Sequence, residues 1–202
     1  MFKSITPSNV GWLEHKLNAD ELKHLWMCVD EHVSDAKPQL IGHVDKSINI
    51  KDIGDLFLFN TINPLINEFS TTFKYKHENI YKEHPYFLKD FWVNYQHQHE
   101  YQPIHNHGGA YSFVIWLKIP TDYEEQNKDN TANSKLNGVF EIQYLNILGE
   151  TCMYRYQLTK KDEGTMLFFP SRLLHAVYPY YNCEEERVSI SGNVWVNTDI
   201  SR

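Results

Sequence analysis

Residues 187–197, RVSISGNVWVN, alternate polar and apolar side chains, which is the period-two pattern of a half-buried β-strand. On such a strand Arg187, Ser189 and Ser191 share one face, while Val188 and Ile190 share the other. Small polar residues headed by an arginine on a central strand are more typical of a pocket wall than of a solvated surface. The stretch therefore predicts a β-rich fold with a polar pocket.

The same strand-like texture extends backwards to Phe91. Several runs alternate in polarity, they are rich in aromatic and β-branched residues, and turn-forming residues separate them. A jelly roll is the natural way to close that many antiparallel strands. The remaining predicted strands are FWVNYQ (91–96), AYSFVIWLKI (110–119), GVFEIQYLN (138–146), CMYRYQLT (152–159) and TMLFFP (165–170).

The first part of the chain has a helical periodicity instead. Within residues 11–35 the apolar residues recur at near-helical spacing, and Asn18 or Asp20 is a candidate helix cap. Residues 55–82 repeat the pattern, with Pro64 marking a first turn or a break. We therefore expect helices to precede the strands.

We expect the chain to form one domain over residues 1–202, because no internal repeat stands out and the length suits one core. Residues 1–85 would form a helical buttress with early strands, and residues 86–202 the jelly-roll core. The polar segment 121–138 is interpreted first as a solvated loop, partly disordered, and second as a lid over a site.

Composition and charge narrow the class of protein. The net charge of -7 disfavours binding to the phosphate backbone of a nucleic acid, so nucleic acid is not the expected partner. The three cysteines form no C-x-x-C pair, and the N-terminal sequence lacks the apolar region of a signal peptide. No apolar run approaches the length of a membrane span. A cytoplasmic protein without a membrane partner is the expectation.

Histidines crowd into one short segment, QHQHEYQPIHNH. On a strand, His105 and His107 point to the same side and can offer two imidazoles to one ion, which suits iron, zinc, copper or nickel. Alone, such a pair is more often a pair of surface histidines. His97 and His99 form another pair, interpreted as an exposed strand extension or turn.

A third histidine and an anion anchor stand downstream. His175 follows an apolar strand, although a lone histidine there is more often a packed core residue. Arg187 follows twelve positions later, and arginine is the side chain best suited to hold a carboxylate in bidentate geometry. Ser189 can donate a hydroxyl to the same carboxylate. The plainer alternative is that Arg187 pairs with one of the glutamates at 184–186.

This order of parts resembles the 2-oxoglutarate/Fe(II) oxygenase superfamily, and within it a branch found in marine bacteria and phages. The stretches that carry the resemblance are PIHNHGGAYSFVIWL (103–117) and FPSRLLHAVYPYYNCEEERVSISGN (169–193), and LIGHVDKSINI (40–50) resembles the early segment of that branch more loosely. The resemblance covers residues 40–197, and its C-terminal motif is the most specific part. It implies a double-stranded β-helix, a jelly-roll and cupin-like fold.

The resemblance also implies a set of site residues and cofactors. The cofactors would be iron(II) and the co-substrate 2-oxoglutarate. His105 and His175 would be metal ligands, and Arg187, assisted by Ser189, would bind the distal carboxylate of 2-oxoglutarate. Two further residues could contact the co-substrate, namely Asn94, at a position where some superfamily members place an asparagine, and its neighbour Tyr95. An apolar interior could be lined by Trp116, Phe140, Tyr144 and Phe168, whose alternative role is ordinary core.

One position departs from the superfamily pattern. Most members have a carboxylate at the second ligand position, whereas this chain has His107. We expect His107 to bind the metal as a third imidazole. A carboxylate from elsewhere, Glu100 or Glu141, is the alternative, but neither has the fixed i+2 relation to His105.

The expected function is hydroxylation of an unidentified substrate with release of succinate and CO2. The substrate would be a small molecule or a side chain, and the aromatic-rich helical part offers a surface for a homodimer. The alternatives are a cupin-like metal-binding protein and a three-histidine dioxygenase that does not use 2-oxoglutarate. The usual cupin pattern has a glutamate shortly after H-x-H, and here GGAYSF follows instead.

Overall fold

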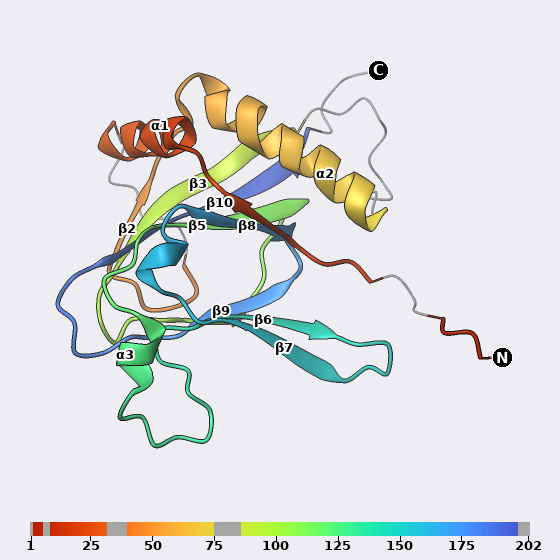
Figure 1. The fold of residues 1–202 in the computed structure, drawn as a ribbon. Coiled ribbons are helices and arrows are strands. Elements are labelled where there is room, and N and C mark those ends of the chain that lie inside the picture. Colours follow the sequence, from red (N-terminus) through yellow and green to blue (C-terminus); the bar gives the residue numbers. More distant parts are fainter. Residues whose placement is uncertain (1, 6–8, 32–39, 75–85, 198–202) are drawn as a thin grey trace.

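The computed structural model describes residues 2–5, 9–31, 40–74 and 86–197. Within these residues, ten strands form two antiparallel sheets, one of six strands in the order β1-β8-β5-β10-β3-β2 and one of four in the order β4-β9-β6-β7 (Figure 1). The strands are β1 (Leu13–Lys16), β2 (Lys46–Asn49), β3 (Tyr86–Gln96), β4 (Gln102–His105), β5 (Tyr111–Lys118), β6 (Phe140–Leu145), β7 (Thr151–Tyr156), β8 (Thr165–Pro170), β9 (Leu174–Val177) and β10 (Arg187–Val196).

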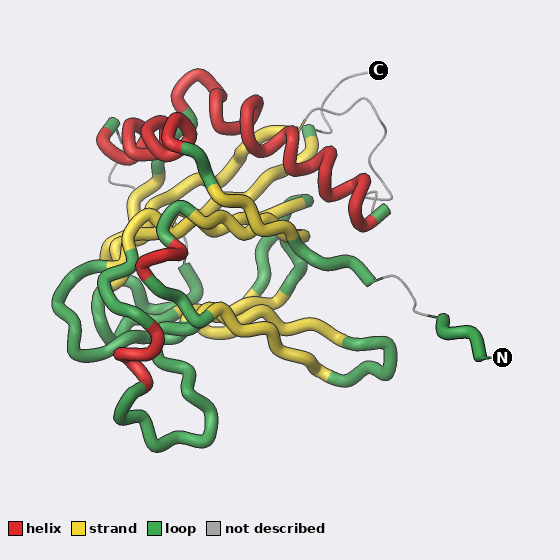
Figure 2. The backbone as a smooth tube through the Cα atoms, in the orientation of Figure 1, coloured by secondary structure: helices red, strands yellow, loops and turns green. Residues whose placement is uncertain are grey.

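The two long helical segments lie on one side of this pair of sheets, and a short third helix lies beside the four-stranded sheet (Figure 1). Figure 2 shows the two long helical segments in red above the six-stranded sheet, with the four-stranded sheet on the opposite side. The helices are α1 (Ala19–Asp30), α2 (Asn63–Phe73) and α3 (Tyr123–Asn127), with short turns of other helix types at η1 (Ile53–Asp55), η2 (Leu58–Ile62) and η3 (Lys160–Asp162). The predicted class, mainly β with N-terminal helices in a jelly roll, is confirmed.

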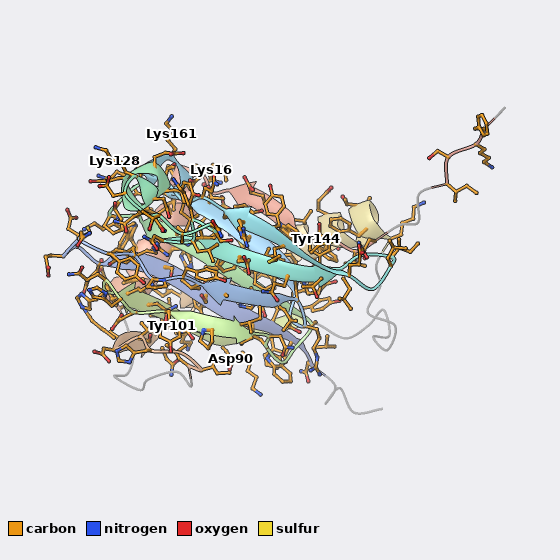
Figure 3. All side chains as sticks on the ribbon, turned by 90° about the horizontal axis from the view of Figure 1, so that it is seen from below. Lys16, Asp90, Tyr101, Lys128, Tyr144 and Lys161 are labelled. Atoms are coloured by element: carbon orange, nitrogen blue, oxygen red, sulfur yellow. The ribbon has the colours of Figure 1, made fainter. Side chains whose placement is uncertain are left out.

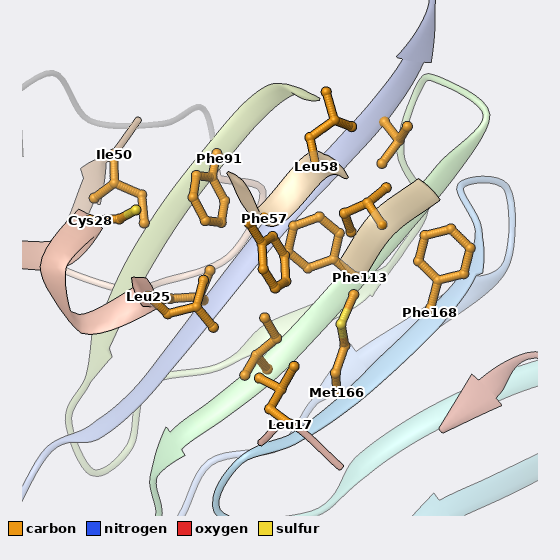
Figure 4. Close-up of a cluster of buried hydrophobic side chains, with 14 of the residues drawn as sticks. Leu17, Leu25, Cys28, Ile50, Phe57, Leu58, Phe91, Phe113, Met166 and Phe168 are labelled. Atoms are coloured by element: carbon orange, nitrogen blue, oxygen red, sulfur yellow. The ribbon is translucent and has the colours of Figure 1, made fainter. Parts of the chain in front are cut away.

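Two apolar cores lie on the two faces of the six-stranded sheet. Strand β5 contributes to both, because alternate residues point to opposite faces. Phe113 and Ile115 pack with the helices in the outer core, together with Leu25 and Phe57 (Figure 4). The inner core lies between the sheets and comprises Val114, Trp116, Ile119, Phe140, Ile142, Leu158, Leu167 and Phe169.

Helix α1 begins where the sequence indicates. Asn18 is its N-cap and accepts hydrogen bonds from the backbone N–H of Asp20 and Glu21, while the Glu21 side chain accepts from the Asn18 N–H. Pro64 occupies the first turn of α2, directly after the π-helical turn η2. Both capping predictions are confirmed, and the part of the predicted segment beyond Lys74 lies outside the described residues.

The helix predicted over residues 11–35 is wrong at its start. Residues 13–16 form β1, which pairs with β8 in the register Leu13↔Phe168 to Lys16↔Thr165. Leu13 packs on the outer core in either conformation, so its helical spacing to Leu17 could not reveal the strand. The edge of the sheet supplied by β8 decided the structure of this segment.

The segment 121–138 is more ordered than predicted. It contains α3, and the buried Asn127 donates its amide to the carbonyls of Tyr123 and Asn137. Gln126 also donates to the Tyr181 carbonyl and accepts from the Tyr181 N–H. These side-chain bonds to backbone groups replace the hydrophobic pattern whose absence suggested disorder.

Among the described residues, every helix falls short of the length and apolar character needed to cross a membrane.

Candidate active site

Three histidines converge between the two sheets. His105 ends β4 and is the register partner of His175 on β9, while His107 follows His105 by two residues. Their ring nitrogens can all lie within 4.8 Å of one another, and Nε2 of His107 is 3.2 Å from Nε2 of His175. The chain thus brings together the three histidines that the sequence singled out.

Backbone contacts fix the segment that carries His107. Its N–H donates to the Ser171 carbonyl at 2.8 Å, and the buried Ser171 hydroxyl donates to the Gly109 carbonyl. Gly109 has φ +95°, and a Cβ at this position would lie 2.8 Å from the Val194 carbonyl oxygen. A glycine is therefore required there for the turn to bring His107 back over the sheet.

The histidine rings are held in one tautomer. Nδ1 of His105 donates to the Pro103 carbonyl at 2.7 Å, and Nδ1 of His175 donates to the Leu173 carbonyl at 2.9 Å. The proton therefore lies on Nδ1 in both rings, which leaves Nε2 with a free lone pair.

Burial keeps these imidazoles neutral. It lowers the pKa of His175 to about 3 and the pKa of His107 to about 4, and the neighbouring histidine charges act in the same direction. Burial also lowers the pKa of His105, against the bond to Pro103. Neutral imidazole is the form that binds a metal, so no proton has to leave before an ion enters.

A cavity of about 490 Å³ opens beside the three histidines. Its floor is one face of β3 and β10, on which alternate residues point inward. Apolar walls come from both sheets. The floor residues are Asp90, Trp92, Asn94, Gln96, Arg187, Ser189, Ser191 and Asn193, and the walls include Val114, Trp116, Phe140, Phe169 and Val177.

Arg187 is a buried cation on the cavity floor without a carboxylate partner. Its side chain is 2% exposed, and Nη2 donates to the Gly138 carbonyl at 3.0 Å. Within the described part of the chain, Nε and Nη1 have no hydrogen-bond partner. Burial lowers the pKa of Arg187 to about 10, which still leaves it charged at neutral pH. Two guanidinium nitrogens are therefore available to a ligand.

The plainer alternative for Arg187 fails, because the three preceding glutamates have other partners. Glu184 accepts from Gln98, Glu185 pairs with Lys118 at 2.8 Å, and Glu186 lies near Lys46 and His97.

The family model described as "Putative 2OG-Fe(II) oxygenase" matches residues 90–193, which is more than half of the chain. The chain belongs to this family of 2-oxoglutarate/Fe(II) oxygenases. The match spans the cavity floor, all three histidines and Arg187.

Solved structures share the oxygenase fold at low sequence identity. The chain is similar to a 2OG-Fe(II) oxygenase family oxidoreductase from Burkholderia pseudomallei, with a TM-score of 0.57, 15% identity and coverage of 92% of this chain and 84% of that one. It is also similar to a prolyl-4-hydroxylase from Pseudomonas putida, with a TM-score of 0.52, 17% identity and coverage of 93% and 92%. None of the curated proteins matches its sequence.

A third similar structure is the viral collagen prolyl hydroxylase of Paramecium bursaria Chlorella virus-1 in complex with 2-oxoglutarate. Its TM-score is 0.50 at 15% identity, and the match covers 91% of this chain and 94% of that chain. Identities this low show a common fold and leave the substrate open.

The oxygenase is an oxidoreductase whose cofactors are iron(II) and 2-oxoglutarate. The side chains that line the cavity are of the types that bind these two cofactors. Three neutral imidazole nitrogens suit iron. A guanidinium with two unpartnered nitrogens suits a carboxylate.

Asn94 and Tyr95, the two further residues predicted to contact the co-substrate, lie on opposite faces of β3. Asn94 lines the cavity, where its side-chain oxygen accepts from the Ser47 hydroxyl at 2.7 Å. Tyr95 points to the opposite face, where it packs on the outer core with the Lys46 ammonium 3.9 Å from its ring. Because neighbours on a strand cannot share a face, we do not retain Tyr95 as a co-substrate contact.

The carboxylates considered in place of His107 lie elsewhere. Glu100 accepts from the backbone N–H groups of Asp45 and His97, and Glu141 is 2.7 Å from Arg155. Neither is among the residues that line the cavity. His97 and His99 are exposed in the turn after β3, as predicted.

The predicted interior aromatic residues are half right. Trp116 and Phe140 line the cavity, whereas Phe168 belongs to the outer core and its neighbour Phe169 takes the inner place. Tyr144 is not a lining residue, and it lies on β6 beside Trp12 (Figure 3).

The sequence analysis missed three residues that line the cavity, two on β3 and one on β10. Asp90 and Trp92 line the cavity with Asn94 because they precede it by four and two positions on the same face. Asn193 extends the face of Arg187 and Ser189 in the same way. The period-two rule applied outward from Asn94 and Ser191 would have found all three.

Proposed function

We propose that His105, His107 and His175 bind the iron(II), and that Arg187 with Ser189 binds the distal carboxylate of 2-oxoglutarate. The observation that carries this proposal is the buried Arg187, which offers two unpartnered nitrogens to the cavity into which three neutral imidazoles point. The enzyme would hydroxylate its substrate with release of succinate and CO2.

The three histidines support an iron site with open positions. Each ring offers one nitrogen, and the bonds from Nδ1 of His105 and His175 orient Nε2 toward the common point. Three protein ligands leave room at the metal for a chelating co-substrate and for dioxygen, as in facial-triad oxygenases. Three neutral ligands also leave a higher net charge on iron(II) than two imidazoles and a carboxylate would.

Arg187 would orient the co-substrate from the other end. A guanidinium holds a carboxylate through two parallel hydrogen bonds, and this fixes direction as well as position. Ser189 follows on the same face of β10 and would donate its hydroxyl to the same group, with Asn94 opposite it on β3. When bound, iron(II) and 2-oxoglutarate supply the activation of dioxygen that oxidation of a C–H bond requires.

The apolar walls would keep water away from the reacting groups. Trp116, Phe140 and Phe169 are each at most 2% exposed and line the cavity beside the histidines. In a water-poor site the charge of Arg187 acts more strongly on a bound carboxylate, and a reactive species is shielded from side reactions. The substrate would be a small molecule or a side chain that enters this cavity.

The rival function, a three-histidine dioxygenase without 2-oxoglutarate, leaves Arg187 unexplained. Burying a cation without a partner costs several kcal/mol, and in that reaction only an anionic substrate could supply the partner. A cupin-like metal-binding protein meets the same objection.

Release of succinate from 2-oxoglutarate tests the proposal. The wild-type protein supplied with iron(II) and air should release succinate slowly even without substrate, and omission of iron should stop it. His175→Ala should abolish the release, whereas His99→Ala, in the exposed turn, should retain it. Absence of succinate from the wild-type protein, or full release by His175→Ala, would count against the proposed site.

A further inference from the structure

The cavity floor has a second charged residue, at the end opposite Arg187. In the antiparallel register Arg187 faces Gln96, and Asn193 faces Asp90. Gln96 lies six positions after Asp90, which is about 20 Å along a strand at about 3.3 Å per residue. Trp92 lies between these ends, with its ring centroid 6.0 Å from that of His107. His107 therefore lies beside the part of the floor that joins the two charges.

Among the described residues that line the cavity, Asp90 is the one acidic residue, and it lies on β3 (Figure 3). Its Oδ2 accepts from the Asn193 amide at 3.1 Å and from the Trp195 indole at 3.4 Å. Its Oδ1 has no hydrogen-bond donor among the described residues, and no lysine or arginine nitrogen of those residues lies within 4.0 Å of the carboxylate. The neighbouring Lys89 points elsewhere, over the Trp195 ring.

Trp92 adds a second unfilled polar group at this end. Its indole is 6% exposed and lines the cavity, and Nε1–H has no acceptor within the described ranges. A buried N–H without an acceptor destabilises the protein, so a ligand that supplies an acceptor there is favoured. On one face of β3, two positions apart, Trp92 thus lacks a hydrogen-bond acceptor and Asp90 lacks a cationic partner.

We propose that Asp90 and Trp92 form the substrate-binding end of the cavity, and that the substrate carries a protonated amine or guanidinium beside a hydrogen-bond acceptor. This inference rests on the proposed function, because it assigns the Arg187 end to the co-substrate. Asp90 Oδ1 receives the cationic group, Trp92 Nε1 donates to the acceptor, and the intervening carbon is presented to the metal side. Asn193 holds the Asp90 carboxylate in orientation through Oδ2.

The charge arrangement supports this division of the cavity. Arg187 attracts a dianionic co-substrate to one end of the cavity, and Asp90 repels it from the other end. The co-substrate and a cationic substrate can therefore bind at the same time, each at its own end. A substrate of negative charge would meet Asp90 unpaired, at a cost that disfavours its binding.

Calorimetric titration of the iron(II)- and 2-oxoglutarate-loaded protein without oxygen tests the inference. The probes are butylammonium and butylguanidinium ions, with N-butylurea as the uncharged isostere. At least one cation should bind about tenfold or more tightly than N-butylurea, since a hydrogen bond to a charged group contributes about 1.5–3 kcal/mol. This comparison on the wild-type chain depends on no variant. Equal binding of the cations and N-butylurea, or no detectable binding of either cation, would overturn the inference.

Asp90→Asn should remove the preference for the cation, because the amide oxygen can still accept from Asn193 and Trp195 but the charge is lost. Asp129→Asn, which removes the same charge from an exposed position outside the cavity, should keep it. A preference that survives Asp90→Asn contradicts the assignment. Nα-acetyl-arginine methylamide distinguishes the sources of the cation: tighter binding than butylguanidinium indicates a peptide side chain, and weaker binding indicates a free small molecule.

The proposed function is measured separately. If the wild-type protein binds 2-oxoglutarate and releases succinate but shows no preference for the cationic probes, the substrate inference fails alone. If it does not bind 2-oxoglutarate, the proposed function fails with it.

Discussion

Among the single residues of the site, Arg187 is the most important for the proposed function. Arg187 is buried with one hydrogen bond, to the Gly138 carbonyl, and with two nitrogens that have no partner in the described structure. A charge in that situation destabilises the protein unless an anion arrives. A carboxylate that pairs with Arg187 removes this destabilisation, so binding of the carboxylate raises the free energy of unfolding of the protein.

His107 is the site residue at which the chain departs from the usual pattern of a carboxylate. We predict that His107→Ala weakens iron(II) binding by at least about 100-fold, because loss of a direct ligand exceeds the 10–100-fold effect of losing an outer-shell partner. His97→Ala, an exposed histidine outside the cavity, is the matched control and should bind iron as the wild type does. The measurement is the metal content after equilibrium dialysis. Unchanged iron in His107→Ala would show that two histidines suffice.

The same histidines predict a pH dependence for the metal-free protein. Burial lowers the pKa of His107 to about 4 and of His175 to about 3, so the unfolded chain binds protons near pH 6.5 while the folded chain does not. The free energy of unfolding should therefore fall as pH falls from about 7 toward 4, by up to about 1.4 kcal/mol per pH unit for each histidine.

Urea unfolding of the metal-free protein between pH 7 and 5 measures this slope. His175→Gln should flatten it, since glutamine does not titrate. Equal slopes in His175→Gln and the wild type would mean that His175 is not held neutral by burial.

Part of the site was readable at the residue scale. H-x-H and R-x-S each place two side chains on one strand face, and this rule found His105, His107, Arg187 and Ser189 among residues that the structure brings to one cavity. Tyr95 was misplaced because it was included as the sequence neighbour of Asn94, and Phe168 because the inward face of its strand was not determined. Counting outward from Asn94 corrects Tyr95, and the pairing of β8 with β5 is needed to place Phe169 inside.

At the scale of elements, β10 lies at the centre of the six-stranded sheet and pairs with both β3 and β5. It can do so closely because Gly192 has no side chain. A Cβ there would lie 2.5 Å from Cζ of the buried Phe113 and 2.9 Å from the Asp90 carbonyl oxygen. The packing of β10 on its neighbours, and with it the position of the cavity floor, depends on this residue.

We predict that Gly192→Ala destabilises the protein by about 1–3 kcal/mol through overpacking. Ser191→Ala, one residue earlier, adds no atom and should cost less. Replacing Phe113 with leucine in the same chain should relieve part of the clash, so the double variant should lose less than the two single variants combined. Chemical denaturation gives all four values. Additive losses would mean that Phe113 is not what the new methyl group meets.

The long strands from β5 onward were predicted closely, and the four-residue strands were not. Residues 165–170 and 187–197 show a period of two or a dense apolar run, and both became strands within a residue of the prediction. The short strands β1, β2, β4 and β9 have four residues each, too few for a period to be seen. Their conformation comes from pairing with longer neighbours, which is information held elsewhere in the chain.

At the scale of the whole molecule, the outer core joins the first and second parts of the chain. Leu25 and Phe57 from the helical part pack with Phe113 and Met166 from the sheet (Figure 4). We propose that the chain unfolds as one unit, since neither part buries this core alone. Near-ultraviolet and far-ultraviolet circular dichroism should give coincident urea transitions. Two separated transitions would show that the helical part unfolds independently.

Binding of 2-oxoglutarate through Arg187 is the central requirement of the proposed function. Calorimetric titration of the iron(II)-loaded protein without oxygen should show binding by the wild type and a loss of at least about 30-fold in affinity in Arg187→Met, since removing one partner of a buried charge pair costs about 2–5 kcal/mol. Arg172→Met, which removes an exposed arginine, should bind as the wild type does. An Arg187→Met protein that is folded and retains wild-type affinity would contradict the account.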